Sequence, residues 1–239
     1  MKYIEKKASN EPGTLKTYRE TTPNASYVGF VDTGQSLKKA LLEEQGHLCA
    51  YCMKRISLKR SNLGRGEQAT KPMVEVEHYL SQKEFPEKDL DYTNMLGVCN
   101  GFSQGDIHCD KSRLETRLKV LNPLEKQVEK LVAYSLDGRI LPAKQVEEVE
   151  HDLKLLNLNN ENLKKARRDA VDIAMGQLIK QYPNKQWTKE FIQKEIETWS
   201  RTHQKVSQND EVEKRFRPFC QVAIWFLKDL QKRNRYPAK

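Results

Sequence analysis

Four cysteines in the first half of the chain occupy positions from which they can share one metal ion. Cys49 and Cys52 form a C-x-x-C pair in HLCAYCMKRI, and Cys99 and Cys109 form a wider pair in GVCNGFSQGDIHCDKSR. Two thiolates at short spacing can occupy two corners of a zinc tetrahedron, and a second pair from elsewhere in the chain completes it. We therefore expect these cysteines to form a closed, structural zinc site.

Two other interpretations of these cysteines compete with zinc. They can be ordinary thiols that happen to lie near each other, or they can form disulfides. The segment MKYIEKKASN lacks the apolar core of a signal peptide, and no later segment is long and apolar enough to span a bilayer. A cytoplasmic, reduced protein without membrane contact is expected, and in that compartment clustered cysteines more often bind metal. Cys220, in the apolar stretch FRPFCQVAIWFLKDL, is predicted to be a buried helix residue without a chemical role.

An acid–histidine pair lies between the two cysteine pairs, in PMVEVEHYLSQ. Hydrolysis of a phosphodiester needs a base that takes a proton from water and a cation that stabilises charge on the phosphate and the departing oxygen. His78 suits the first task near neutral pH, and Glu77 can bind a divalent cation such as Mg²⁺ or Mn²⁺. Asp110, directly after Cys109, is expected to supply a second carboxylate. Asn94 is expected to hold the intervening loop through its side-chain amide.

The adjacency of Glu77 and His78 sets a geometric condition. Neighbouring residues of a regular strand face opposite sides. Both side chains can therefore reach one centre only if the strand ends, twists or bulges at Tyr79, which the turn-rich segment SQKEFPEKD permits. Without such a break, the two residues are an edge-strand pair with no catalytic role.

The chain is basic, because 42 Lys and Arg residues against 33 Asp and Glu residues leave a formal net charge of +9. Such a charge favours a polyanionic partner, although lysine-rich faces are also found on proteins that bind none. A basic segment, residues 53–71, follows the first cysteine pair and is positioned to hold nucleic-acid phosphates beside the site. Its candidate phosphate-binding residues are Lys54, Arg55, Lys59, Arg60 and Arg65.

Turn signals and hydrophobic periodicity predict the elements that must position these residues. Residues 1–35 are rich in Pro, Gly, Thr and Asn and are expected to be extended or loosely structured and to pack on the body. Ser36 is expected to cap a helix that ends at Gly46, just before the first cysteine pair. The alternating valines of MVEVEH indicate a strand, and DKSRLETRLKVL predicts a helix that ends before Pro123.

After about residue 124 the pattern changes to long amphipathic stretches, so the second half is predicted to be wholly helical. Helical spacing recurs over 146–156, 163–174 and 191–199. The last predicted helix covers about 212–230, with an early interruption at Pro218. No Gly-rich nucleotide-binding loop with its lysine is found, so any ATP binding must come from a partner.

The order of these motifs resembles that of the HNH endonuclease family. A C-x-x-C pair comes first and is followed by Glu-His, an Asn, a Cys and finally Cys-Asp-Lys-Ser. That family has a ββα-metal fold, often with a four-cysteine structural zinc, and the resemblance covers about residues 46–118. It implies that His78 is the general base and that Asn94 orders the loop. It assigns the catalytic cation to Glu77 and Asp110 and the zinc to the four cysteines.

This chain departs from the family pattern in its second cysteine pair. Nine residues separate Cys99 from Cys109, and Asp110 stands where the family often has Asn or His. His108 therefore remains an alternative second ligand of the catalytic cation.

A wider pattern, EPGTLKTYRETTPNASYVGF followed by LLEEQGHLCAYC and a helical remainder, is similar to the HNH nuclease subunit of Septu-type anti-phage systems, some of which are attached to retrons. This similarity implies an effector nuclease that an ABC-type or SMC-like ATPase restrains until infection. It also implies a retron reverse transcriptase complex as a further partner. The helical half would be the docking surface, and the substrate would be nucleic acid, DNA more than RNA.

The chain is thus predicted to be α+β and mostly helical. An N-terminal lead-in and helix would cover residues 1–45, a ββα-metal core with its zinc site 46–120, and a helical region 121–239. Two other functions stay open. One is a free-standing restriction-type or homing-type HNH nuclease. The other is a non-catalytic, zinc-stabilised nucleic-acid-binding module in which Glu77 and His78 are structural.

Overall fold

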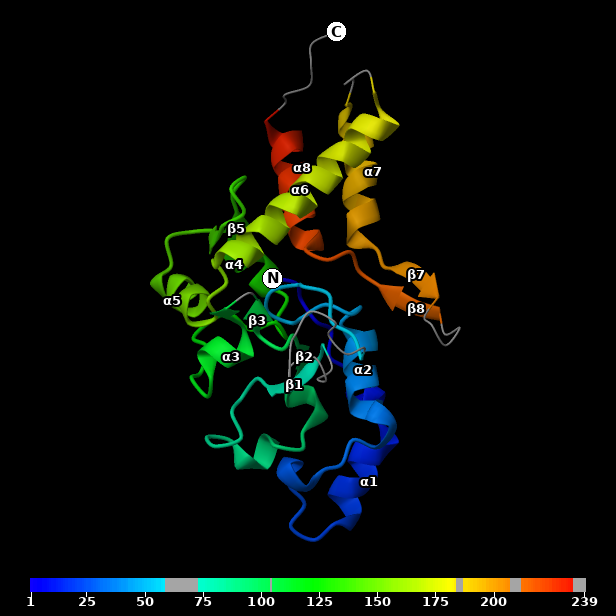
Figure 1. The fold of residues 1–239 in the computed structure, drawn as a ribbon, viewed down its shortest axis with the longest axis vertical. Helices are drawn as coiled ribbons and strands as arrows, with labels where there is room; N and C mark the ends of the chain where they lie inside the picture. The colour runs from blue at the N-terminus through cyan, green and yellow to red at the C-terminus, as the bar shows by residue number, and fades with distance from the viewer. Residues whose placement is uncertain (59–72, 104, 184–186, 207–211, 234–239) are drawn as a thin grey trace.

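The computed structural model describes residues 1–58, 73–103, 105–183, 187–206 and 212–233. Within these ranges the chain is an α+β protein in which helices predominate and the strands form short antiparallel hairpins, as the sequence predicted. Figure 1 shows the N-terminal helices at one end of the long axis, long C-terminal helices at the other, and strands β1 and β2 between them. Among the described helices, none combines the length and the apolar composition that a membrane crossing requires.

The N-terminal part contains two helices, α1 (Gly13–Thr21) and α2 (Ser36–Glu44). The expectation that residues 1–35 are extended or loosely structured is therefore wrong for α1. Pro12 lies at the start of this helix, where a missing N–H costs nothing because the first N–H groups have no intrahelical partner. The cluster that packs α1 against α2 contains Leu15, Leu37, Leu41, Leu90, Tyr92 and Met95.

The predicted helix before the first cysteine pair is confirmed, but its cap is a different residue from the one expected. Ser36 is the first residue of α2, and the side chain of Asp32 accepts hydrogen bonds from the N–H groups of Leu37 (2.8 Å) and Lys38 (3.3 Å). A carboxylate binds free N–H groups at a helix start more strongly than a hydroxyl does. Gly46 follows the helix with a φ of +55°, a conformation that favours glycine.

The central hairpin pairs β1 (Glu75–His78) with β2 (Met95–Val98) in antiparallel register, so Glu77 lies opposite Leu96. The strand predicted from alternating valines is thus confirmed. A loop that contains short 3-10 turns, among them Tyr92–Asn94, joins the two strands.

A second, smaller hairpin separates the last two cysteines of the cluster. It consists of β3 (Phe102–Ser103) and β4 (Asp106–Ile107) and lies between Cys99 and Cys109. The short helix α3 (Asp110–Arg113) follows at once.

The helix predicted from DKSRLETRLKVL is much shorter than expected, because only α3 forms. Leu114 ends it with a φ of +54°. Further along, the carboxylate of the fully buried Asp152 accepts three backbone hydrogen bonds of 2.8–2.9 Å. The donors are the N–H groups of Lys119, Val120 and Leu121. Because Asp152 binds these N–H groups, they are not available for helical bonds.

The prediction that the second half is wholly helical is wrong, since it also contains two hairpins, β5–β6 and β7–β8. The elements in chain order are α4 (Val128–Leu131), β5 (Val132–Tyr134), β6 (Ile140–Pro142), α5 (Glu147–Leu155), α6 (Glu161–Gln181), α7 (Lys189–Ser200), β7 (His203–Val206), β8 (Val212–Arg215) and α8 (Cys220–Lys232). The predicted helix over 212–230 begins only at Cys220. Pro218 cannot donate a helical hydrogen bond, and Phe219 adopts a left-handed conformation directly before the helix.

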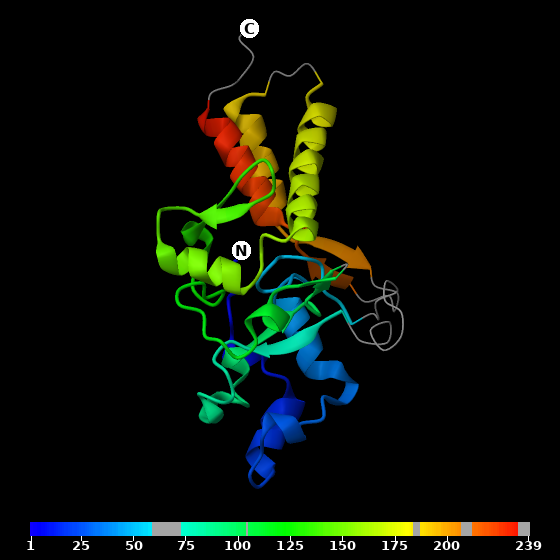
Figure 2. The ribbon, with the colours of Figure 1, turned by 60° about the vertical axis from the view of Figure 1, so that its left-hand side comes forward.

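Helices α6, α7 and α8 pack side by side in both ribbon views (Figures 1 and 2). The main hydrophobic cluster continues from these helices into the region of β1 and β2, and it includes Met1, Val98 and Leu227. The predicted division at residues 45 and 120 therefore crosses a continuous core, and its status as separate domains stays a prediction.

Candidate metal centre and adjoining acidic site

The sulfur atoms of Cys49, Cys52, Cys99 and Cys109 all lie within 4.8 Å of one another. The Cys49–Cys109 and Cys52–Cys99 sulfur distances are 3.9 Å and 3.8 Å, and all four side chains are buried and free of disulfides. A zinc ion with four thiolates at about 2.3 Å separates the sulfurs by about 3.8 Å. The donor set and its spacing therefore fit a metal ion such as zinc, and the predicted convergence of the four cysteines is confirmed.

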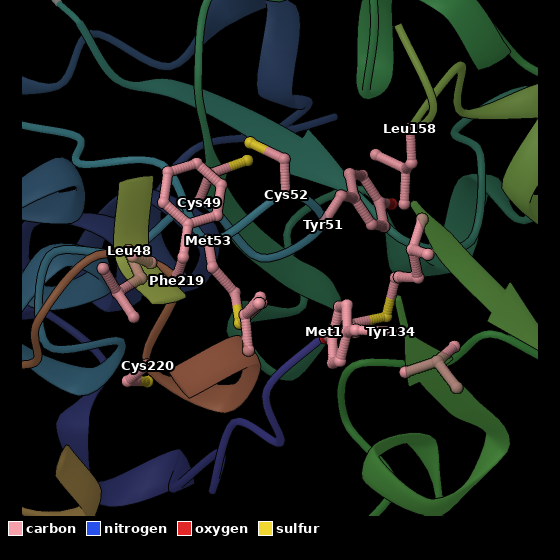
Figure 3. Close-up of a cluster of buried hydrophobic side chains, with 14 of the residues drawn as sticks. Met1, Leu48, Cys49, Tyr51, Cys52, Met53, Tyr134, Leu158, Phe219 and Cys220 are labelled. Atoms are coloured by element: carbon pink, nitrogen blue, oxygen red, sulfur yellow. The ribbon is translucent and has the colours of Figure 1, made fainter. Parts of the chain in front are cut away.

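Local backbone bonds hold the first cysteine pair against the central hairpin. The Cys49 N–H donates to the carbonyl of Lys54 (2.9 Å), and the Ala50 N–H donates to the carbonyl of Gly97 in β2 (3.1 Å). Figure 3 shows the sulfurs of Cys49 and Cys52 directed toward each other, with Cys220 at a distance from both. The expectation that Cys220 is a buried helix residue is confirmed.

The second pair reaches the same point from the ends of two elements. Cys99 directly follows β2, and Cys109 directly precedes α3. The Cys109 N–H donates to the carbonyl of Leu156 in the C-terminal half (2.9 Å). The cluster thus joins the central hairpin, α3 and the segment after α5.

Burial and the proximity of the four thiols oppose the ionisation of all of them at once. Burial raises the pKa of Cys49, but hydrogen bonds from the other three thiols outweigh this effect and bring it well below its usual value. Burial and the same neighbours raise the pKa of Cys109 well above its usual value. One thiolate is therefore stabilised at the expense of its neighbours, whereas a bound zinc ion would stabilise all four.

Glu77 lies in a buried polar contact that the sequence did not reveal. Its Oε1 accepts a hydrogen bond from the hydroxyl of Tyr51 (2.9 Å) and lies 2.8 Å from Nε of Arg113. The carboxyl group of Asp110 also acts on that of Glu77. Burial and Asp110 raise the pKa of Glu77, and Arg113 opposes them. Two carboxyl groups that interact in this way repel when both are ionised, and a divalent cation relieves that repulsion.

The neighbouring His78 has a fixed ring. Its Nε2 lies 2.7 Å from the carbonyl oxygen of Asp89, and because a carbonyl only accepts, Nε2 carries the proton. The edge of the Tyr27 ring packs on it at 4.6 Å between centroids. Among the described residues no hydrogen bond engages Nδ1, so this nitrogen keeps a free lone pair. Burial lowers the pKa of His78, which favours the neutral ring.

Strand β1 ends at His78, directly before Tyr79, where a break is needed if Glu77 and His78 are to reach one centre. Nη2 of Arg113 donates to the carbonyl oxygens of both His78 (3.0 Å) and Tyr79 (3.1 Å). Successive carbonyls of a regular strand point in opposite directions, so two that reach one nitrogen show that the alternation stops at Tyr79. The charge of Asp110 raises the pKa of Glu77 and partly offsets the lowering of the His78 pKa by burial.

His108, the alternative ligand, lies elsewhere. It is fully buried directly before Cys109, and the charge of Cys49 partly offsets the lowering of its pKa by burial. Asp110, by contrast, acts on the pKa of Glu77.

Asn94 bridges the loop between the two strands. Its Oδ1 accepts from the N–H of Leu80 (2.8 Å), and its Nδ2 donates to the carbonyls of Leu80 (3.0 Å) and Lys88 (3.2 Å). All of these contacts are with backbone. Asn94 thus holds the loop that carries Asp89, as its amide was expected to do.

The candidate phosphate-binding residues divide into two groups. Lys59, Arg60 and Arg65 lie outside the described residues. Lys54 is partly exposed, whereas the guanidinium of Arg55 donates to the carbonyls of Gly46, His47 and Phe216. These contacts favour a structural role for Arg55, which ties the segment before α8 to the first cysteine pair.

Tyr51 and Arg113 were not identified as site residues from the sequence, although the spacing between Asp110 and Arg113 could have indicated Arg113. Arg113 lies three residues after Asp110, a spacing that places two side chains on one side of a helical turn. Tyr51 lies inside the C-x-x-C pair and carried no such signal.

No known family model matches this chain, and no curated protein matches it.

Proposed function

We propose that this protein is a metal-dependent HNH-type endonuclease that hydrolyses phosphodiester bonds of nucleic acid, DNA more than RNA. The observation that carries the proposal is the buried Glu77 carboxylate, held by Tyr51 and Arg113 and influenced by Asp110, next to a histidine with a fixed ring. The four-cysteine cluster anchors the same hairpin and would hold a structural zinc ion. The hairpin β1–β2, followed after the small hairpin β3–β4 by the short helix α3, is the order expected for a ββα-metal motif with an insertion.

The residues of the site divide the chemistry between them. His78 accepts a proton at Nδ1 from the water that attacks phosphorus, because Asp89 occupies the other ring nitrogen. As the new P–O bond forms, the bond to the departing 3′ oxygen breaks. Glu77 and Asp110 would hold Mg²⁺ or Mn²⁺, which supplies positive charge for the phosphate and the departing oxygen. Asn94 keeps the loop that carries Asp89 in position.

The cellular role that we propose is that of a cytoplasmic effector in anti-phage defence. Its support is the sequence similarity to the HNH subunit of Septu-type systems, which implies an ABC-type or SMC-like ATPase and, where a retron is attached, its reverse transcriptase complex. The helical bundle of α6, α7 and α8 offers a docking surface for such a partner. A free-standing nuclease would use the same chemistry but would cut without a partner.

One observation favours the non-catalytic alternative, a zinc-stabilised nucleic-acid-binding module. The Glu77–Arg113 pair is buried, and buried ion pairs also occur at purely structural positions. In that case the basic surface would bind nucleic acid, and His78 would serve packing alone.

A cleavage assay separates these functions. The wild type and His78→Ala are incubated with plasmid DNA or total RNA in Mg²⁺ or Mn²⁺, each protein alone and with its genomic neighbours. His203→Ala, at an exposed position of β7, is the matched control. Chelator-sensitive cleavage by the wild type and by His203→Ala, but not by His78→Ala, supports the nuclease. Nucleic-acid binding without cleavage in every preparation supports the binding module.

A further inference from the structure

Arg113 connects three parts of the candidate site. Its Nε contacts the Glu77 carboxylate at 2.8 Å, and its Nη2 donates to the His78 and Tyr79 carbonyls at 3.0 and 3.1 Å. The side chain is almost completely buried, with 2% of its surface exposed. One planar guanidinium therefore determines both the direction of the Glu77 side chain and the bend that ends β1.

Tyr51 contacts the same carboxylate oxygen. Its hydroxyl donates to Oε1 of Glu77 at 2.9 Å, and its ring lies 5.8 Å from the guanidinium carbon of Arg113. In Figure 3 the Tyr51 ring extends away from the sulfurs of Cys49 and Cys52, between which it lies in sequence. Tyr51 is thus a direct link from the four-cysteine cluster to Glu77.

The hydrogen bond from Tyr51 and the ion pair with Arg113 both involve Oε1, so together they restrict the rotation of the Glu77 carboxyl group. With Oε1 engaged in these contacts, the other oxygen is the one that a cation shared with Asp110 would use. Hydrogen-bonded partners of metal-binding carboxylates orient them, and their removal typically weakens metal binding about 10–100-fold. A lysine could replace the charge of Arg113 but not its fork of fixed donors.

We propose that Tyr51 and Arg113 are positioning residues that orient Glu77 to bind a divalent cation together with Asp110. The inference deepens the proposed nuclease function and rests on it. Tyr51 would make the cation site depend on the four-cysteine cluster, because the same short turn carries both. Arg113 would make the cation site depend on the bend of the chain after His78.

The test measures Mn²⁺ binding to the full chain directly, by electron paramagnetic resonance of free Mn²⁺, together with cleavage as a function of Mn²⁺ concentration. The variants are Tyr51→Phe and Arg113→Lys. The matched control is Tyr92→Phe, which removes another buried hydroxyl, one that donates to Glu44 (3.1 Å) rather than to Glu77. Zinc content and circular dichroism establish that each variant is folded.

Tyr51→Phe is expected to weaken Mn²⁺ binding about tenfold or more and to raise the Mn²⁺ concentration for half-maximal cleavage by the same factor. The rate at saturating Mn²⁺ should change less, since the missing hydroxyl does not touch the reacting atoms. Arg113→Lys should show a larger loss, and Tyr92→Phe should match the wild type. A merely structural role would alter stability without this selective effect on Mn²⁺.

Two negative results remain distinguishable. Wild-type Mn²⁺ binding that Tyr51→Phe and a folded Arg113→Lys both retain at full strength would overturn the positioning role and leave the nuclease proposal intact. A wild type that neither binds Mn²⁺ nor cleaves nucleic acid would overturn the proposed function itself. If Arg113→Lys does not fold, Tyr51→Phe decides the question alone.

Discussion

The carboxyl group of Asp110, the first residue of α3, raises the pKa of Glu77, the third residue of strand β1. Only Glu77 has a buried arginine beside it at 2.8 Å. The two carboxylates therefore have different consequences for stability, and under the proposed function they would hold the catalytic cation together.

Removal of each carboxylate should separate stability from activity. Glu77→Ala leaves Arg113 buried without its charged partner, so we expect it to lower the free energy of unfolding by about 3–5 kcal/mol. Asp110→Ala removes a repulsive neighbour of Glu77 and should leave the free energy of unfolding unchanged or higher. Both variants should lose metal-dependent cleavage. Urea unfolding and cleavage assays test this, and an equal destabilisation by both would contradict it.

The pH dependence of cleavage should report the state of His78. Burial lowers its pKa below the usual 6.5, and only the neutral ring can accept a proton. Activity should therefore rise with pH through a midpoint below 6.5 and should not fall again from deprotonation of this residue. His78→Ala should cut the rate about 10²–10⁴-fold and abolish this limb of the profile. A midpoint above 7 would contradict the assignment.

Metal removal should disable the acidic site through Tyr51. One zinc ion per chain is expected by elemental analysis, and a strong chelator should unfold the region around the cysteines. Because Tyr51 lies between Cys49 and Cys52, loss of zinc should also weaken Mn²⁺ binding at Glu77. Cys49→Ser should reproduce both effects, whereas Cys220→Ser, at a buried thiol outside the cluster, should keep its zinc. Gently purified protein without zinc would contradict the prediction.

Asn94 should affect catalysis through the loop. Asn94→Ala removes the side-chain bonds to Leu80 and Lys88, so we expect a loss of about 2 kcal/mol in the free energy of unfolding. Since the same loop presents the Asp89 carbonyl to His78, cleavage should fall as well. Asn94→Asp keeps the acceptor for Leu80 but loses both donors, and its effect should be intermediate. Wild-type activity in Asn94→Ala would show that the loop does not depend on this amide.

Local patterns in the sequence predicted the elements that short-range interactions determine. The C-x-x-C spacing indicated the four-cysteine cluster, and the alternating valines indicated β1. Helical periodicity indicated α5, α6 and α7. These features depend on residues a few positions apart, so the amino-acid order contains enough information. The mostly helical α+β class followed from the same patterns.

The predictions failed where a distant residue competes with a local preference. The helix after Asp110 stops early, and the buried Asp152 binds three N–H groups of the segment beyond it. Strand β8 pairs with β7 in a hairpin, although the sequence predicted that its residues belong to a helix over 212–230. Arg55, which looked like a phosphate-binding residue in a basic run, binds carbonyls of Gly46, His47 and Phe216.

The sequence by itself determined which residues can do chemistry: four thiols, a Glu-His pair, a following Asp and a loop Asn. Only the tertiary structure decided which of them meet. Folding brings the four thiols together, buries the His108 ring, and adds Tyr51 and Arg113 to the Glu77 carboxylate. The reason is physical, since residue type and spacing limit local geometry, whereas contacts between distant segments depend on how the whole core packs.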